Sequence, residues 1–427
     1  MWSMRTGENM SAIVELRASK PSKWLNLTFF ILCAAVVGYA WLSRAGQRYY
    51  DEVEYWEIAG HLARGQGFAL QGQPTAYRPP AWPLILAPFH SLGSGIGVAT
   101  MASVACLILA ALAAGRLGMI LTGQRLGSLA AIFVLAYPIN IYTSATLYPQ
   151  MLALLTTVVM WMLVAQAEAQ GRLPWLWGCV LGLAAAVMTL AVPTLAFTAV
   201  ALLAAGSWIL WRRRDWPAIV AGWAAAGALM GAWAIRNWIV FREFIPISTS
   251  TGINLLIGNN PDATAGSGVD VDLQASMQRV FSMGLSENGR SSEFMREALH
   301  WITSNPGDAA MLYLQKTAHY FVAYDAPATA GQGKPVMGLI AWAALVVIAG
   351  LTVARWSNWG RRTFPMHFTE RVMLFVFIAN APIMAVFFTR VRFRVPLDSF
   401  LLIEAAIGLL IVAYHFMPAL RERAATT

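Results

Sequence analysis

Three arginines at alternate positions follow an apolar segment near the C-terminus, where arginine would be unusual. They are Arg390, Arg392 and Arg394, and Pro396 comes directly after them. In an extended chain, a period of two places all three guanidinium groups on one side. Converging guanidinium groups are typical of sites that bind phosphate or pyrophosphate. The spacing therefore predicts a phosphate site at the depth of the lipid headgroups, with anchoring to those headgroups as the alternative.

A second chemical signal is the acidic pair Asp51–Glu52, which follows the first long apolar segment. A carboxylate at a membrane surface can act as a general base toward a hydroxyl or an amine. Acidic residues are also common in the first turn of a helix. The amphipathic stretch from Tyr55 to Arg64 predicts such a helix, lying in the membrane interface. The two roles are compatible.

Other polar residues could join this chemistry. Arg78 lies in the turn Tyr77–Pro80, which the two prolines make rigid. Arg236 lies at the end of another apolar segment, where it could bind phosphate or simply extend its side chain to the membrane surface. The glycines and asparagines of 251–261 predict tight turns with exposed backbone amides, which bind sugar hydroxyls or phosphate oxygens or are purely structural. Lys316, with Tyr320 one helical turn later, could assist a phosphate site or simply be solvated.

The elements that must position these residues are membrane-spanning helices. The chain has 427 residues, of which 58% are hydrophobic and 12% charged, and the mean hydropathy is +0.56. Apolar stretches of about 20 residues recur along the sequence, enough to cross a bilayer, and they lack the polar faces of a soluble bundle. The net charge of +9 comes mostly from arginines in short loops, which signal topology rather than nucleic-acid binding.

The pattern predicts an all-α polytopic membrane protein with about ten spans, together with interfacial helices and a small helical periplasmic region. Arginine-rich loops place both ends in the cytoplasm, at 1–23 and 417–427. Residues 24–239 would hold spans one to seven and the first outer loop at about 44–94, residues 240–335 the second outer loop, and residues 336–416 the last three spans. The predicted spans are roughly 24–43, 95–115, 127–144, 149–167, 175–191, 193–211, 217–239, 336–354, 372–389 and 397–416.

Several shorter features complete these expectations. The apolar run Ala81 to Phe89 is too short to span a membrane, and helical patterns occur near 271–283 and 290–304. The first apolar segment is too long for a signal-peptide core and predicts an uncleaved span. The cysteines all fall in apolar runs, which predicts inert thiols without a disulfide framework; they are Cys33, Cys106 and Cys179.

The sequence lacks the residues and motifs that are typical of several other functional classes. Glu404 is nearly the only acid within the predicted spans, whereas secondary transporters place ionisable groups near the midplane for ion coupling. The six histidines form no metal-ligand spacing such as HExxH, and no P-loop, Rossmann glycine pattern or nucleophile elbow is present. Nucleotide-driven transport is therefore not supported.

Taken in order, these motifs resemble the GT-C membrane glycosyltransferases, over about residues 24–415. The resemblance is to the bacterial branch similar to protein O-mannosyltransferases and the lipid A aminoarabinose transferase. The motifs are Asp51–Glu52, Tyr77-Arg78-Pro79-Pro80-Ala81-Trp82-Pro83, Gly252-Ile253-Asn254-Leu255, Gly258-Asn259-Asn260-Pro261, Asn305-Pro306 with Lys316, and Arg392-Phe393-Arg394-Val395-Pro396.

The resemblance implies an inverting transfer of one sugar from a polyprenyl (undecaprenyl) phosphate carrier. The transfer would occur on the periplasmic face of the cytoplasmic (inner) membrane, to a lipid, glycan or protein acceptor. By the same resemblance, Asp51 is the general base, and Glu52 supports it or helps to hold a metal ion. The donor-phosphate ligands that the resemblance implies are Arg78, Lys316, Arg390, Arg392 and Arg394, and the position of Arg236 adds it to this set. The predicted sugar or acceptor ligands are Tyr77, Gln150, Asn254, Asn259 and Tyr320.

One position departs from the family pattern. Relatives often carry an acid in the loop between the third and fourth spans, where this chain has Leu147-Tyr148-Pro149-Gln150. No metal ligand is therefore assigned, and a divalent-metal requirement stays open. The alternative functions are a flippase or transporter for polyprenyl-linked lipids, which needs no catalytic acid, and a ligase or polymerase of pre-built glycans.

Overall fold

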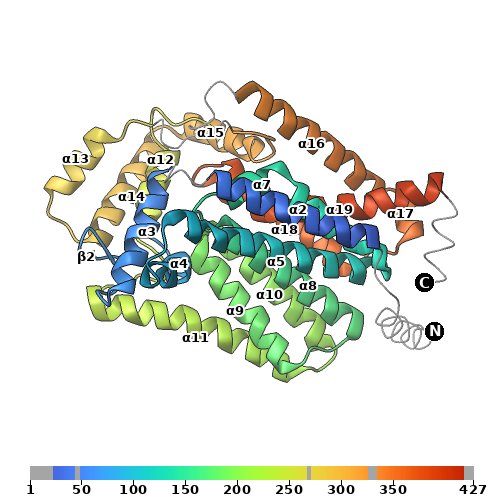
Figure 1. The fold of residues 1–427 in the computed structure, drawn as a ribbon. Helices are drawn as coiled ribbons and strands as arrows, with labels where there is room; N and C mark the ends of the chain where they lie inside the picture. The colour runs from blue at the N-terminus through green and yellow to red at the C-terminus, as the bar shows by residue number, and fades with distance from the viewer. Residues whose placement is uncertain (1–22, 44–48, 267–270, 326–333, 418–427) are drawn as a thin grey trace.

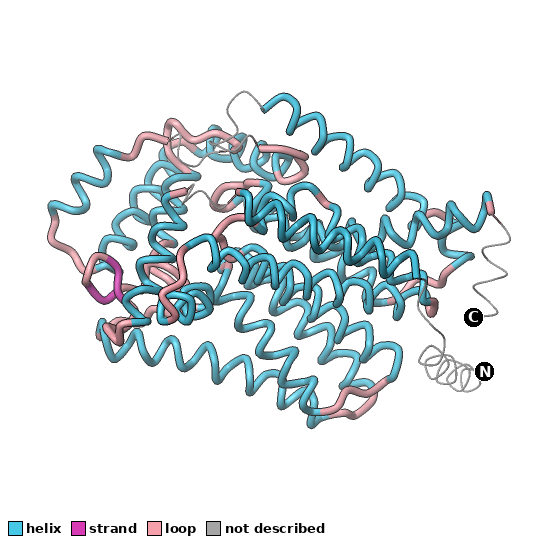
Figure 2. The backbone as a smooth tube through the Cα atoms, viewed as in Figure 1, coloured by secondary structure: helices cyan, strands magenta, loops and turns pink. Residues whose placement is uncertain are grey.

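A computed structural model gives the fold and describes residues 23–43, 49–266, 271–325 and 334–417. Apart from Lys23 and Met417, the predicted cytoplasmic segments 1–23 and 417–427 lie outside the described residues. Helices dominate the described chain (Figures 1 and 2). In chain order the helices are α2 (Lys23–Leu42), α3 (Tyr50–Ala63), α4 (Ala81–Ser91), α5 (Ile96–Thr122), α6 (Leu129–Ala136), α7 (Pro138–Ser144), α8 (Gln150–Gln170), α9 (Trp175–Ala191), α10 (Ala196–Arg212), α11 (Trp216–Phe241), α12 (Thr251–Gly258), α13 (Gln274–Ser282), α14 (Glu287–Ser304), α15 (Pro306–His319), α16 (Lys334–Trp356), α17 (Asn358–Thr363), α18 (Phe368–Ala385) and α19 (Val391–Phe416).

Eight helices in the described part of the chain are long and apolar enough to cross a membrane. A ninth span is added if α6, with the 3-10 turn before it, and α7 are counted as one, although the pair is bent by 58°. The bend occurs because Pro138 forces Tyr137 out of the helical region, to ψ 118°. The remaining predicted span, 175–191, corresponds to α9, a shorter apolar helix of 17 residues that is outside this count. The chain is an all-α, multi-pass membrane protein.

The membrane-spanning helices pack around α19. In its most apolar window α19 is 83% buried, whereas α2 and α16 are each 11% buried and line the outside of the bundle. Small residues bring neighbouring backbones together, as is common in membrane helices. A Cβ atom added at Gly178 of α9 would lie only 2.3 Å from the carbonyl oxygen of Ala218 in α11, so these two helices need the glycine.

Several shorter elements gather at one end of the bundle, which we call the α3 end. Figure 1 shows α3, α4 and α12 to α14 there, with α3 lying across the direction of the spans, as predicted for an interfacial helix. The strands β1 (Ala69–Leu70) and β2 (Gln73–Pro74) form an antiparallel hairpin. Its turn residues Gln71 and Gly72 have positive φ angles of 53° and 73°, the backbone that a tight hairpin turn requires.

Two charged side chains tie this hairpin to the rest of the α3 end. Arg236 of α11 donates to the carbonyl oxygens of Thr75 and Phe68, each at 2.8 Å. Glu287 of α14 accepts from the Thr75 hydroxyl at 2.7 Å, from the Ala76 amide at 2.9 Å and from the Thr249 hydroxyl at 2.5 Å. These bonds join the hairpin, which precedes α5 in the chain, to α11 and to the segments that follow α11.

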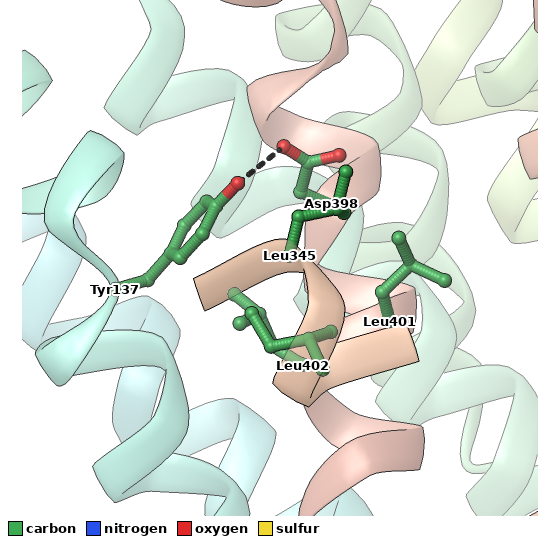
Figure 3. Close-up of a pocket in the computed structure, with 6 residues that line it drawn as sticks. Tyr137, Leu345, Asp398, Leu401 and Leu402 are labelled. Carbon is green, nitrogen blue, oxygen red and sulfur yellow. Dashed lines mark hydrogen bonds between the residues drawn. The ribbon is translucent and has the colours of Figure 1, made fainter. Parts of the chain in front are cut away.

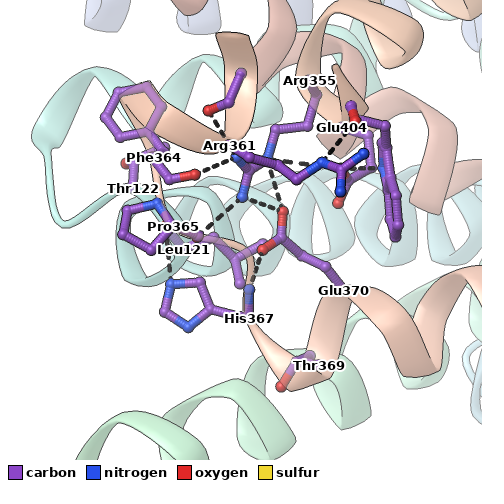
Figure 4. Close-up of polar contacts among 12 residues, drawn as sticks. Leu121, Thr122, Arg355, Arg361, Phe364, Pro365, His367, Thr369, Glu370 and Glu404 are labelled. Atoms are coloured by element: carbon purple, nitrogen blue, oxygen red, sulfur yellow. Dashed lines mark hydrogen bonds and ion pairs between the residues drawn. The ribbon is translucent and has the colours of Figure 1, made fainter. Parts of the chain in front are cut away.

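The opposite end of the bundle contains a buried ionic cluster (Figure 4). Arg355 contacts Glu370 at 2.6 Å and Glu404 at 3.8 Å, and all three side chains are fully buried. Arg355 also donates to the carbonyl oxygens of Phe364 and Pro365. Arg355, in the last turn of α16, thereby joins α16, α18 and α19.

Candidate functional site

The candidate site begins at the first turns of α3. Asp51 and Glu54 are three residues apart, so their carboxylates lie on the same face of the helix. Glu52 points elsewhere: its carboxylate accepts from the amides of Tyr49 at 3.2 Å and Leu147 at 2.8 Å. The first of these bonds caps the helix, and the second fixes the loop between α7 and α8. Glu52 therefore positions its neighbours and does not lie in the ion-pair cluster.

Arg78 lies between the two carboxylates of α3. Its Nη2 atom is 2.6 Å from Oδ1 of Asp51, and its Nε atom is 2.5 Å from Oε2 of Glu54. The rings of Tyr55 and Tyr77 lie 5.4 and 5.1 Å from its guanidinium carbon. Pro79 and Pro80 lead directly into α4, so the chain around Arg78 has little freedom. Arg78 and Tyr77 thus lie together at Asp51.

Arg392 approaches Asp51 from the other side. It lies in the first turn of α19, and its Nη1 atom is 3.3 Å from Oδ2 of Asp51 and 2.7 Å from the hydroxyl of Tyr148. Its guanidinium carbon is 4.9 Å from the Tyr148 ring centre. Its Nε atom is buried and has no hydrogen-bond partner among the described residues. The described part of the protein therefore leaves one N–H group of Arg392 unsatisfied.

The two carboxylates of α3 have different electrostatic environments. Burial would raise the pKa of Asp51, but the charges of Arg78 and Arg392 and hydrogen bonds from Arg78 and Tyr148 outweigh it and lower that pKa. At Glu54 burial outweighs the charge of Arg78, and the pKa is raised. Opposite shifts of neighbouring carboxyl groups are a feature of acid–base sites. Asp51 is the group that is held ionised.

The site is accessible from outside the protein. The exposed fractions of the side chains are 23% for Asp51, 15% for Arg78 and 31% for Arg392. Burial raises the pKa of both Tyr55 and Tyr77 to about 12, so their hydroxyls stay protonated near neutral pH and can donate hydrogen bonds. A carboxylate, two guanidinium groups and two phenol rings thus lie together at the α3 end.

The three alternating arginines do not converge, and the prediction of an extended segment is wrong. Residues 391–416 are helical, so Arg392 and Arg394 point to different sides. Arg394 is buried and binds Asp398 at 2.7 Å and the carbonyl oxygen of Tyr320. Arg390 precedes the helix and donates to the carbonyl oxygen of Gly266 at 3.4 Å. Of the three, only Arg392 contacts Asp51 in the described structure.

Asp398 borders a small cavity between α7, α16 and α19 (Figure 3). The Tyr137 hydroxyl donates to Asp398 at 3.2 Å. The cavity is too small to hold a water molecule, and its other lining residues are Leu345, Ile348, Leu401 and Leu402. Arg394 is therefore part of a buried network inside the bundle.

Lys316 has a structural environment. It is fully buried, and its Nζ atom donates to the carbonyl oxygens of Gly258 and Phe387 and to Oδ1 of Asn259, at 2.9 to 3.1 Å. Burial lowers its pKa to about 8. Asn259 also donates to the carbonyl oxygens of Leu255 and Val386. These two predicted ligands hold α12, α15 and the chain before α19 together.

The segment predicted to form tight turns with exposed amides is helical instead. Gly252 and Gly258 lie in and at the end of α12, where an added Cβ would come within 1.8 Å of the carbonyl oxygens of Ser291 and Phe387. Close backbone approach, and not turn geometry, is the reason for these glycines. Asn254 is half-buried on the same helix.

The remaining predicted ligands lie apart from the Asp51 contacts. Arg236 anchors the hairpin, as described above. Gln150 begins α8 and is buried, with Oε1 lacking a partner in the described structure. Tyr320 follows α15 and is buried, and its hydroxyl likewise has no partner there. Among the described residues, no group of three or more His, Cys, Asp and Glu side chains could hold a metal ion.

Sequence reasoning overlooked two members of the site. Glu54 could have been recognised from its spacing of three residues to Asp51 within an expected helix. Tyr148 gave no signal, because only the fold brings the loop before α8 next to Arg392. That loop is held by the bond between Glu52 and the Leu147 amide and by the Trp82 indole, which donates to the Leu147 carbonyl oxygen at 2.6 Å.

Comparison with known proteins gives one distant structural likeness. No family model matches the chain, and no curated protein matches it. Among solved structures, the chain is similar to the archaeal oligosaccharyltransferase AglB from Archaeoglobus fulgidus, in complex with an inhibitory peptide and a dolichol-phosphate. The TM-score is 0.48 at 12% identity, and the match covers 94% of this chain and 52% of AglB, so this chain spans about half its length. A likeness at this level carries no functional argument.

Proposed function

We propose that the protein is a GT-C type glycosyltransferase that moves one sugar, with inversion, from a polyprenyl-phosphate carrier to an acceptor hydroxyl or amine. The observation that supports this proposal is the position of Asp51 between Arg78 and Arg392. A carboxylate for the acceptor and cations for the phosphate are the two groups that such a transfer needs. The motif resemblance supports the same assignment.

Asp51, Arg78 and Arg392 are sufficient to accept the proton and to stabilise the charge that this transfer produces. The acceptor oxygen or nitrogen attacks the anomeric carbon and gives its proton to Asp51 as the new glycosidic bond forms. The bond between the anomeric carbon and the phosphate oxygen breaks, and its electron pair leaves with the polyprenyl phosphate. That phosphate gains a negative charge, which the fixed guanidinium groups of Arg78 and Arg392 stabilise more in the transition state than before it.

The ion pairs of Asp51 determine the order in which donor and acceptor bind. While both arginines bind the carboxylate, Asp51 is a weak base, because its pKa is lowered. A donor phosphate competes for the same two guanidinium groups. Once they bind phosphate, Asp51 loses its stabilising partners and becomes a stronger base. The donor therefore activates the base, and productive acceptor binding follows donor binding.

Lipid and glycan analysis of a strain that lacks the protein tests the function. We expect mass spectrometry to find one sugar missing from a surface glycan or lipid and the corresponding polyprenyl-phosphate sugar accumulating. Expression of the wild-type protein, or of Asp308→Asn with its exposed carboxylate on α15, should restore the sugar. Asp51→Asn should not, because removal of a general base slows such steps about 10²- to 10⁴-fold.

Other outcomes would reject the proposal. Full restoration by Asp51→Asn would remove the carboxylate from the mechanism and favour a flippase or transporter, which needs the arginines but no base. Loss of long glycan chains, with the single-sugar donor pool unchanged, would identify a ligase or polymerase.

A further inference from the structure

The turn between α10 and α11 contains a hollow that the proposed reaction does not use. It lies at the end of α11 opposite Arg236, and therefore away from the α3 end. Its volume is about 540 Å³, within the range of roughly 300–1,000 Å³ that is typical of small-molecule sites. Its lining residues are Trp211, Arg212, Arg214 and Trp216.

The charge that lines this hollow is positive. The only acid in the turn, Asp215, accepts the amide of Leu173 at 2.9 Å and so is tied to the chain before α9. The Arg213 side chain packs beside Gly171, at 3.3 Å from the position that a Cβ would take there. Arg212 and Arg214 remain beside the hollow. Two guanidinium groups at one concave surface fit a phosphate group.

Exposed indoles surround the same turn. Trp208, Trp211, Trp216 and Trp223 are 44–52% exposed, and the guanidinium carbon of Arg212 lies 4.9 Å from the Trp208 ring. Tryptophan gathers at the boundary between water and the hydrocarbon of a membrane. Since α10 and α11 are both long and apolar enough to span a membrane, the hollow lies where lipid headgroups are found.

We propose that this hollow binds the headgroup of an anionic phospholipid. Arg212 and Arg214 contact the phosphate oxygens, and the indoles of Trp211 and Trp216 contact the glycerol backbone and the start of the acyl chains. A soluble phosphate ligand would explain the arginines but not the exposed indoles around them, so a lipid is the better fit. The site is independent of the proposed transferase activity.

The test uses the full-length protein in nanodiscs of phosphatidylcholine with increasing phosphatidylglycerol. Native mass spectrometry counts the phosphatidylglycerol molecules that stay bound. We expect wild type to retain it in preference to phosphatidylcholine, and Arg212→Gln/Arg214→Gln to lose that preference, with affinity falling about fivefold for each arginine. Arg213→Gln removes one charge from the same turn, as the single variants Arg212→Gln and Arg214→Gln each do, but does not touch the hollow. It should retain wild-type binding.

Three results would overturn the proposal. Equal loss in Arg213→Gln and Arg212→Gln would show general attraction by a basic turn and no defined site. Displacement of the bound phosphatidylglycerol by millimolar inorganic phosphate would identify a soluble-anion site instead. Unchanged binding in the double variant, with a wild-type melting temperature that proves it is folded, would exclude the two arginines.

Discussion

The Nη1 atom of Arg392 lies 3.3 Å from Oδ2 of Asp51, although 341 positions separate the two residues in the chain. Two residues further along the same helical turn, Arg394 binds the buried Asp398 instead. The start of α19 therefore divides its arginines between an accessible carboxylate and an internal one, and the two should respond differently to mutation.

Asp51→Asn should bind the carrier lipid more tightly than wild type while losing sugar transfer. The asparagine no longer competes for Arg78 and Arg392, so undecaprenyl phosphate meets two unpaired guanidinium groups. The affinity for undecaprenyl phosphate, measured by microscale thermophoresis in detergent, should rise several-fold. Glu57→Gln, which removes the same charge from the exposed part of α3, is the control and should change it little. Weaker binding in Asp51→Asn would refute the exchange of ion pairs.

Arg392→Gln and Arg394→Gln should have separable effects. Arg392→Gln removes a phosphate ligand from an accessible site, so carrier affinity should fall about tenfold with little change in the melting temperature. Arg394→Gln leaves Asp398 buried without its cation, which should destabilise the protein by about 3–5 kcal/mol. Thermal unfolding and carrier binding, measured on the same samples, distinguish the two. Equal effects on affinity would restore the idea of a joint arginine clamp.

The pH dependence of transfer should differ between kcat/KM and kcat. Asp51 acts as a base only when ionised, so activity falls as the pH drops through its pKa. In the free protein that pKa is lowered, and kcat/KM should stay high to low pH. In the donor complex the arginines bind phosphate, the pKa rises, and kcat should decline at a higher pH. If kcat and kcat/KM declined at the same pH, donor binding would not be raising the pKa of Asp51.

Lys316→Met should lower stability and leave donor affinity unchanged. The methionine fills a similar volume but leaves three buried acceptors without a donor, which should cost about 3 kcal/mol or more. The melting temperature reports this loss, and the affinity for undecaprenyl phosphate is measured on the folded fraction. A large drop in affinity at an unchanged melting temperature would return Lys316 to the phosphate site.

The start of α19 should loosen as the pH rises through the folded pKa of His319, which is raised from its ordinary value. Asp325 accepts the Val391 amide at 2.8 Å and contacts His319 at 3.2 Å. The hydrogen bond to Asp325 is the main cause of the raised pKa of His319, so this contact stabilises the fold at low pH and is lost as the pH rises through the folded pKa. Hydrogen exchange at 391–394, corrected for intrinsic rates, should therefore increase in that range. His319→Gln should show no such change.

The helices were predictable from sequence, because a run of about 20 apolar residues has few alternatives. Each of the ten predicted segments contains a helix, although 127–144 is broken at Tyr137 and the helix in 372–389 ends at Ala385. The break at Pro138 was visible in principle, since proline disfavours helix at the residue before it. Local signals were less informative where glycine and proline serve packing: the glycines near 252–258 permit contact with Ser291 and Phe387, which no local pattern reveals.

The site was partly predictable. Asp51, Arg78 and Arg392 were named from their types and their places beside apolar segments, and they meet. Arg390, Arg394 and Lys316 looked equivalent in the sequence and differ in the fold. An alternating pattern of arginines cannot tell a strand from the first turn of a helix, and α19 continues through Pro396. Which cation faces solvent depends on the fold, which brings Asp51 and Tyr148 to Arg392 and the Tyr320 carbonyl oxygen to Arg394.

The hairpin turn at Gln71–Gly72 is a suitable place to insert an antibody epitope for imaging. Both residues are exposed, while Arg236 and Glu287 hold the segment behind them through the Phe68 and Thr75 carbonyl oxygens and the Thr75 hydroxyl. A short epitope inserted at this turn would project from a fixed point a few residues from Arg78. An antibody fragment bound there would add the rigid mass that particle alignment of a 46.6 kDa membrane protein in a micelle requires.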